Sequence, residues 1–460
     1  MTGVQTCALP ILAASIDVAE DRAQWSALCD RLGIAQPPGA TATDLAGARA
    51  IVERTGYPVL VRPSYVLGGR AMRIVHDDAQ LAQAMSEMER FGSLGREGGL
   101  SAERPVLIDR FLQDATEVDV DAVRDASGEV LIGGVMEHVE EAGIHSGDSA
   151  CALPPQNLSA AAQVTIADHV RKIADALDVR GLINVQFAVA DDKVYVIEAN
   201  PRASRTVPFV AKATGVPLAM VASRVMLGAT LAELRNEGLL RAPAGGHVSV
   251  KEAVLPFSRF PEVDTTLGPE MRSTGEVMGI DATFGRAFIK SQLAAGTHLP
   301  DSGRVFVSLN DRDKSAAVEI GRALADVGCA IVATAGTAAA LKTGGVPVER
   351  VVGKVSQRDV NTVSQRDVSA PDDAVHLIEG GEIVLVINTP QDRGTHRDGE
   401  AIRKAANVKG VALVTTVRAA RAAVQGMRER RDSPLGIRSL QEFHAASTND
   451  SAPANDKAAP

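Results

Sequence analysis

The sequence predicts an α/β protein in two parts, an α+β domain followed by a doubly wound, mostly parallel α/β domain. Residues 115–125 alternate polar and apolar side chains, as an antiparallel strand covered on one face does, and a second strand-like segment follows at 129–139. Two apolar runs flank Asp191-Asp192, which is a strong hairpin signal. After residue 300 short strand-like and helix-like segments alternate, which predicts the second part.

The composition is that of a globular protein with sizeable cores. A length of 460 residues favours two or three domains, and 45% hydrophobic with 23% charged residues is typical of this class. The net charge of −9 argues against a general nucleic-acid binder. The four scattered cysteines form no C-x-x-C pair, which argues against a zinc site or disulfide framework and favours a cytoplasmic location. No apolar stretch reaches about 18 residues, so we expect no membrane span.

The boundaries come from changes in pattern. Residues 1–12 lack periodicity and are interpreted as a non-native leader. From Asp17 the pattern is helical, with Trp25, Leu28 and Leu32 on one face and Gly33 near the end. We expect a first domain over 13–300, a second over 301–445, and a disordered polar tail over 446–460.

The first domain is expected to start with small alternating elements and to continue with longer strands. Residues 92–103 are rich in glycine and are interpreted as a surface loop, and 261–279 as a structured loop. The other predicted elements are helices near 43–54, 78–91, 159–177 and within 206–240, and strands near 58–64, 73–75, 106–111, 184–190, 193–200 and 247–254.

The second domain contains one internal repeat. VSQRDV occurs at 355–360 and again at 363–368, and we interpret it as a duplication in a surface loop, because loops tolerate insertions at low cost.

The apolar strand VYVIEAN ends in an unusual set of polar side chains. Glu198 and Asn200 stand two apart, so they face the same way, and Gln186 on the neighbouring strand can join them. Three hard oxygen ligands suit Mg²⁺ on nucleotide phosphates. Arg202 and Arg205 follow and suit a phosphoryl group, although a capped surface turn is the bland alternative for the strand end alone.

Two further segments have ligand-binding composition. RPSYVLGGRAM offers a glycine pair for backbone approach to phosphate, with Arg70 as a cation, unless it is only a tight turn. The loop around His145 is rich in glycine, serine and aspartate and can hold a ligand through backbone N–H groups, although His145 alone would be an ordinary loop histidine. Glu117 is either a ribose ligand or a solvated charge on a strand.

Taken together these motifs resemble the ATP-grasp superfamily and, more narrowly, the second half of the carbamoyl phosphate synthase large chain. The segments that carry the resemblance are RPSYVLGGRAM, MEHVEEAGIHSGDSACALPP, RGLINVQFAV, VIEANPRASRTVPFVAKATGVPLA and LGPEMRSTGEVMG. It covers roughly residues 15–445. The resemblance implies an ATP-grasp domain followed by a regulatory domain like methylglyoxal synthase.

The resemblance implies phosphorylation of carbamate by ATP with Mg²⁺ or Mn²⁺, giving carbamoyl phosphate for pyrimidine and arginine synthesis. It assigns phosphate contact to Arg70, nucleoside contact to Leu112 and Glu117, and metal ligation to Gln186, Glu198 and Asn200. Arg202 and Arg205 would lie beside the transferred phosphoryl group. The loop closing over ATP would comprise Gly143, Ile144, His145 and Ser146. Arg110 is a departure, because a histidine is expected there, and its nucleotide contact is uncertain.

The resemblance also implies effectors and partners. A nucleotide effector like UMP or IMP would bind through Ser308, Lys314, Thr334, Thr337, Lys354, Asn388 and Thr389, which could instead be ordinary strand-end turns. Ornithine would bind through Glu140, Asp148, Glu252 and Thr415. Expected partners are a glutaminase small subunit and an N-terminal half of the large chain, which this sequence lacks. The alternatives are another ATP-grasp ligase and a catalytically idle nucleotide- or effector-binding fragment.

Overall fold

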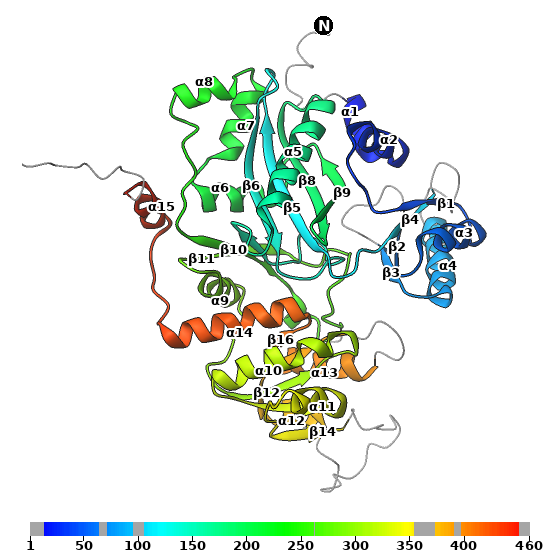
Figure 1. The fold of residues 1–460 in the computed structure, drawn as a ribbon, viewed down its shortest axis with the longest axis vertical. Coiled ribbons are helices and arrows are strands. Elements are labelled where there is room, and N and C mark those ends of the chain that lie inside the picture. Colours follow the sequence, from blue (N-terminus) through cyan, green and yellow to red (C-terminus); the bar gives the residue numbers. More distant parts are fainter. Residues whose placement is uncertain are drawn as a thin grey trace, which may run out of the picture.

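The computed structural model describes residues 13–63, 71–94, 105–261, 263–353, 373–390 and 397–449. Within these ranges the strands form a four-stranded, a seven-stranded and a five-stranded sheet (Figure 1). The first two sheets are antiparallel and the third is parallel, which confirms the predicted α/β class. The leader, the Gly68-Gly69 turn, most of the loop over 92–103 and the VSQRDV repeat lie outside the described residues.

Two helices precede the first sheet. The second of them buries Trp25 and Leu28 and ends at Gly33, whose φ of 67° is a conformation that glycine adopts easily. This is the helix end that the sequence predicts. The bounds are α1 (Ala13–Glu20) and α2 (Arg22–Leu32).

The four-stranded sheet forms a small lobe, in the strand order β1-β4-β2-β3. Val59, Val61 and Ile108 are fully buried under its two helices. The elements are β1 (Gly39–Ala42), α3 (Leu45–Thr55), β2 (Val59–Pro63), β3 (Arg73–Val75), α4 (Asp78–Leu94) and β4 (Val106–Arg110).

The seven-stranded sheet is the centre of the first domain, in the order β11-β10-β7-β6-β5-β8-β9. Asp191 and Asp192 join β8 to β9 with φ of 50° and 59°, which confirms the predicted hairpin. The prediction of a loop over 261–279 is wrong at its end, because the residues from Gly275 onward form a strand that pairs with β10. The strands are β5 (Thr116–Arg124), β6 (Val130–His138), β7 (Cys151–Leu153), β8 (Gly181–Ala190), β9 (Lys193–Asn200), β10 (Val248–Val254) and β11 (Gly275–Asp281).

Helices pack on both faces of this sheet. The apolar side chains of β5, such as Val118 and Val120, pack under α5, which begins after the capping residue Ser159. On the other face α6 and α7 cover Val123 and Leu182, and the same strands become polar beyond that cover. The helices are α5 (Ala160–Ala176), α6 (Val207–Thr214), α7 (Leu218–Met226) and α8 (Leu231–Asn236).

No single helix in the described part of the chain has the length and hydropathy to cross a membrane. Helices α6 and α7 would pass together on length and composition, but they meet at an angle of 115°.

The five-stranded sheet has the order β14-β13-β12-β15-β16, and all its pairs are parallel. Helices cover both faces, as the doubly wound prediction requires (Figure 1). The elements are β12 (Gly303–Ser308), α10 (Ala317–Asp326), β13 (Cys329–Thr334), α11 (Ala335–Thr343), β14 (Arg350–Val352), α12 (Ala374–Glu379), β15 (Ile383–Asn388), α13 (Arg397–Lys409), β16 (Ala412–Val414) and α14 (Val417–Asp432).

One hydrophobic cluster extends across the two predicted domains. Helix α9 (Phe284–Ala294) packs against α14, and Ala287 and Phe288 belong to the same buried cluster as Val305. A Cβ atom on Gly426 would lie 2.8 Å from the carbonyl oxygen of Gly285, so the two helices approach closely. The boundary near residue 300 stays a prediction, because this core continues across it.

The last described helix, α15 (Leu440–Asn449), returns to the first domain and lies near α6 (Figure 1). Phe443 is buried against His247, and His444 Nε2 lies 2.9 Å from the carbonyl oxygen of Lys212. The predicted tail is wrong over 446–449, which the structure assigns to this helix, and 450–460 lies outside the described residues.

Candidate functional site

The polar part of the central sheet is made by alternation along its strands. On β5 the odd-numbered residues Glu117, Asp119 and Asp121 share one face, while Val118 and Val120 point to the opposite core. In the strand register Asp119 stands opposite Gln186, and Asp121 opposite Asn184. A row of carboxylate and amide side chains therefore crosses neighbouring strands on one side of the sheet.

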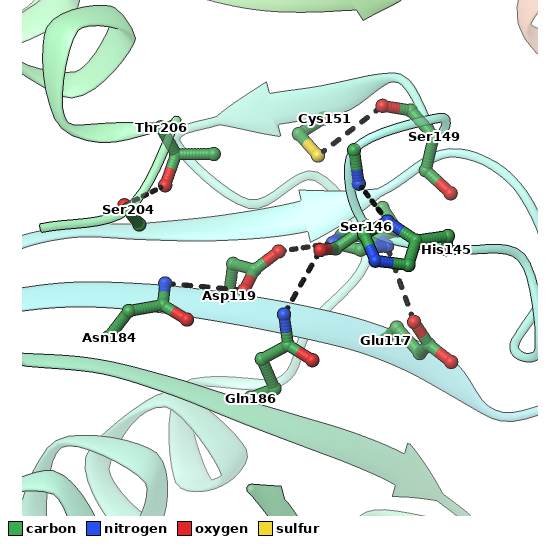
Figure 2. Close-up of polar contacts among 12 residues, drawn as sticks. Glu117, Asp119, His145, Ser146, Ser149, Cys151, Asn184, Gln186, Ser204 and Thr206 are labelled. Atoms are coloured by element: carbon green, nitrogen blue, oxygen red, sulfur yellow. Dashed lines mark hydrogen bonds and ion pairs between the residues drawn. The ribbon is translucent and has the colours of Figure 1, made fainter. Parts of the chain in front are cut away.

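The three predicted metal ligands lie on this row. Gln186 stands opposite Glu198 in the β8–β9 register, and Asn200 follows on the same face. Asn200 Nδ2 donates to Glu198 Oε1 at 2.8 Å. Gln186 Nε2 donates to Ser146 Oγ at 3.0 Å, and Figure 2 shows this side chain pointing to the loop above the sheet.

This donor set fits Mg²⁺ or Mn²⁺ better than a softer metal. One carboxylate and two amide side chains are hard oxygen ligands, which leave room for water and phosphate oxygens. Among the described residues no group of three or more His, Cys, Asp or Glu side chains could hold a metal ion. A divalent cation here would therefore depend on Glu198 with the amide oxygens of Gln186 and Asn200.

The loop over Gly143–Ser149 lies above the metal-ligand row. Gly143 N donates to Glu117 Oε1 at 2.9 Å, and His145 N donates to the carbonyl of Gly268 at 2.8 Å. The φ of Gly143 is 95°, and a Cβ there would lie 2.7 Å from the ring of Phe111, so the position requires glycine. Burial lowers the pKa of His145, which favours its neutral form.

The two arginines at the strand end have different surroundings. Arg202 is exposed and donates through Nη2 to Asn200 Oδ1 at 3.1 Å. Arg205 forms an ion pair with Glu276 on β11 at 3.2 Å and donates to Ser273 Oγ at the same distance. Arg202 is thus joined to the metal-ligand row through Asn200, whereas Arg205 is held by residues of β11 and the segment before it. Their place beside a phosphoryl group stays a prediction.

A buried polar layer supports the site, and sequence reasoning missed it. Asp119 Oδ2 lies 2.9 Å from His138 Nε2, and both side chains are almost fully buried. Burial lowers the pKa of His138, but Cys151 and Asp119 outweigh it and raise the pKa well above its usual value. Lys251 is fully buried and donates to the carbonyl of Ser146 at 3.0 Å. The signal was the polar residue at every second position of the strands.

Asp121 connects this layer to the turn that carries the arginines. Ser204 Oγ and Thr206 Oγ1 donate to its two carboxylate oxygens at 2.7 and 2.6 Å, and Asn184 Nδ2 donates at 3.0 Å. Burial raises the pKa of Asp121 to about 6, although these donors oppose the rise. The carboxylate thus fixes the chain between Arg202 and α6.

The predicted nucleoside residues lie on the connection between the small lobe and the central sheet and at the start of β5. Leu112 is half-buried in the linker, and Glu117 faces the loop through Gly143. Burial raises the pKa of Glu117, while His138 and the Gly143 N–H oppose the rise. Arg110 donates to the backbone carbonyl of Tyr57 within the small lobe. Arg70 lies outside the described residues.

Six of the seven residues predicted for a nucleotide effector gather at the carboxyl ends of β12, β13 and β15. Thr334 Oγ1 donates to Ser308 Oγ at 3.3 Å, and Asn388 Nδ2 donates to the carbonyl of Ser308 at 3.4 Å. Thr337 Oγ1 and Thr389 Oγ1 accept from backbone N–H groups of the same edge. A Cβ on Gly336 would lie 2.8 Å from Lys314 Nζ, which places that ammonium at the start of α11. Lys354 lies outside the described residues.

The residues predicted to bind ornithine lie in different surroundings. Glu140 and Glu252 are buried neighbours, and burial followed by the charge of Glu140 raises the pKa of Glu252 to about 8. The Asp148 carboxylate accepts hydrogen bonds from the backbone N–H groups of Arg272 and Ser273, both at 2.8 Å. Thr415 lies at the end of β16 and lines a cavity of about 140 Å³ with Glu141 and Gly143.

Comparison with known proteins finds similarity for both parts of the chain. Residues 21–234 match the family model of the carbamoyl-phosphate synthase L chain ATP binding domain, and residues 316–415 match the MGS-like domain. The carbamoyl phosphate synthase large chain of Acidobacterium capsulatum is 50% identical over 434 residues, which are 94% of this chain and 38% of that protein. The large chain of Synechocystis sp. is 47% identical over 429 residues, 93% of this chain and 38% of that protein.

Proposed function

We propose that this chain, a homologue of the C-terminal half of carbamoyl phosphate synthase large chains, phosphorylates carbamate with ATP to give carbamoyl phosphate and ADP. It spans 38% of the length of the relatives named above, so the activity of the whole enzyme is part of the proposal. The observation that supports it best is the register that sets Gln186 opposite Glu198, with Asn200 and two arginines at the same strand end.

The reaction needs positioning and charge neutralisation more than covalent help from the protein. A carbamate oxygen attacks the γ-phosphorus of ATP, a new O–P bond forms, and the bond from that phosphorus to the β-bridging oxygen breaks. Mg²⁺ bound by Gln186, Glu198 and Asn200 would neutralise phosphate charge. Arg202 and Arg205 would stabilise the equatorial oxygens, and Arg70 would hold the leaving phosphates.

The surrounding residues prepare this geometry. Asp121 fixes the turn that carries the arginines through Ser204 and Thr206. The loop from Gly143 to Ser146 would close over ATP and exclude water, while Leu112 and Glu117 would face the nucleoside. We assign this chemistry to the predicted domain over 13–300.

The wider proposal concerns partners and regulation. In the complete enzyme a glutaminase small subunit and an N-terminal half of the large chain would supply carbamate, in the cytoplasm, for pyrimidine and arginine synthesis. The domain over 301–445 would bind a nucleotide effector through Ser308, Lys314, Thr334, Thr337, Lys354, Asn388 and Thr389. Ornithine would bind near Glu140, Glu252 and Thr415, and Asp148 would act there through the backbone it holds.

The test is the reverse partial reaction. The purified chain is mixed with Mg²⁺, ADP and carbamoyl phosphate, and ATP formation is followed. Glu198→Gln removes the one carboxylate of the proposed metal site, and Asp192→Asn changes an exposed carboxylate at the far end of the same hairpin as a control. ATP from the parent and D192N, but not from E198Q, would support the function. A folded parent that binds MgADP and forms no ATP would contradict it and identify a binding fragment.

A further inference from the structure

Arg418 of the second domain contacts the segment between the small lobe and the central sheet. Arg418 stands in the first turn of α14 and is half-buried. Its Nη1 donates to Thr116 Oγ1 and its Nη2 donates to the carbonyl of Asp114, both at 2.7 Å. These partners lie more than 300 positions earlier in the chain, so the contact ties the second domain directly to the first.

The segment held by Arg418 joins the small lobe to the central sheet. Strand β4 ends at Arg110 and β5 begins at Thr116, so residues 111–115 are the connection between the two sheets. Asp114 has φ of 58°, a left-handed conformation that few residues other than glycine adopt. This conformation of Asp114 occurs where its carbonyl accepts from the guanidinium. A charged donor is among the stronger partners for such a carbonyl.

The same linker supports the loop above the metal-ligand row. Ala142 N donates to the carbonyl of Ala115 at 3.4 Å, and Gly143 N donates to Glu117 Oε1 at 2.9 Å. The ring of Phe111 lies so close to Gly143 that no side chain fits between them. A shift of the linker would therefore move the loop and the predicted nucleoside residues with it.

We propose that Arg418 is a positioning residue of the nucleotide site, supplied by the second domain. Its guanidinium donates to Thr116 and Asp114, and it acts by fixing the linker at these two residues. The inference rests on the proposed function only in taking this face of the central sheet as the place where nucleotide binds. It also gives the MGS-like domain a way to act on nucleotide affinity, because any displacement of α14 displaces the linker.

The chain offers a matched control on the same helix. Arg421 lies one turn further along α14 and pairs with Glu319 of the second domain, with Nη2 and Oε2 2.7 Å apart. Arg421→Ala therefore removes an arginine and an ion pair of the same helix without touching the linker. Arg418→Lys keeps the charge but can satisfy the two acceptors only with a single ammonium group.

The experiment measures the Kd of MgADP by titration calorimetry on the full chain, with the melting temperature of each variant alongside. We expect R418A to raise the Kd about five- to tenfold, because bonds from a charged donor are the stronger hydrogen bonds of proteins. R418K should lie between R418A and the parent, and R421A should stay within about twofold of the parent. Equal Kd values for R418A and the parent, or equal effects of R418A and R421A, would overturn the proposal.

A second variant keeps the test decisive if R418A folds poorly. Thr116→Val removes one acceptor from the linker side at almost constant volume, and we expect about a threefold rise in Kd. In the double variant R418A/T116V the two effects on the Kd should not add, because R418A already removes the bond that T116V removes. Additive effects would contradict the proposal. MgADP binding needs no carbamate, so it tests the role of Arg418 separately from catalysis. If the reverse reaction fails but the Kd values of the variants follow the expected order, only the proposed function is contradicted.

Discussion

Arg403 and Asp264 form a two-pronged ion pair between the domains, with Nε–Oδ1 and Nη2–Oδ2 distances of 2.7 and 2.6 Å. Arg403 is buried, and its Nη1 also donates to Asn388 Oδ1 at 2.9 Å. The segment that begins at Asp264 continues to Gly268, whose carbonyl accepts from His145 N. The edge proposed for a nucleotide effector is thus connected, through one guanidinium, to the segment that holds the loop above the metal-ligand row.

Replacing Arg403 by leucine should lower the free energy of unfolding by about 2 kcal/mol, less than for a fully buried pair because Asp264 is partly exposed. Burial raises the pKa of Asp264, but Arg403 outweighs it and lowers the pKa below its usual value. The pair therefore stabilises the fold above the ordinary aspartate pKa, and this contribution is lost as pH falls through the lowered value. Urea unfolding should show that the free energies of unfolding of the parent and R403L differ less at acid pH than at neutral pH. The same difference in unfolding free energy at both pH values would contradict a stabilising Arg403–Asp264 ion pair.

Replacing Gly143 by alanine should weaken nucleotide binding and destabilise the chain by about 2 kcal/mol, from left-handed strain plus the clash with Phe111. Gly246→Ala is the matched control, because Gly246 has φ of 72° and a Cβ added there would meet no atom within 4 Å. We expect G246A to show the strain alone, about 1 kcal/mol. Equal losses in the two variants, by urea unfolding and MgADP titration, would show that the contact with Phe111 is unimportant.

Replacing Glu252 by glutamine should change how stability depends on pH. The pKa of Glu252 is raised to about 8, so the folded state keeps a proton that the unfolded chain releases from its usual pKa upward. The parent therefore loses stability as pH rises from about 4.5 to about 8, while E252Q lacks this loss. In urea unfolding E252Q should match the parent near pH 5 and exceed it by a few kcal/mol at pH 9. The exposed Glu89→Gln should follow the parent at both pH values, and an E252Q curve parallel to the parent's would refute the expectation.

Local pattern was sufficient for most elements of the fold. The period-two alternation of β5, the Asp191-Asp192 turn and the Ser159 cap each decide their element from neighbouring residues. The end of the loop over 261–279 was wrong, because Gly275–Asp281 becomes a strand only by pairing with β10. Helix α15 was missed for a similar reason, since its stability comes from burial of Phe443 against the first domain.

The sequence predicts which site residues lie together when they stand on one strand or hairpin, but not when only the tertiary fold brings them together. Glu198 and Asn200 follow from spacing on one strand, and Gln186 from the hairpin. The ion pair of Arg205 with Glu276 joins residues that only the sheet order brings together. The contact of Arg418 with Thr116 has no local signal at all, because it depends on how two domains pack.

The docking of α15 on the first domain also has a consequence for synthesis on the ribosome. This helix is translated after every other described element, yet it covers His247 and the end of α6, which emerge much earlier. In the nascent chain this surface of the first domain therefore stays uncovered until the whole second domain has been translated. Premature termination before Leu440 would leave this surface uncovered permanently.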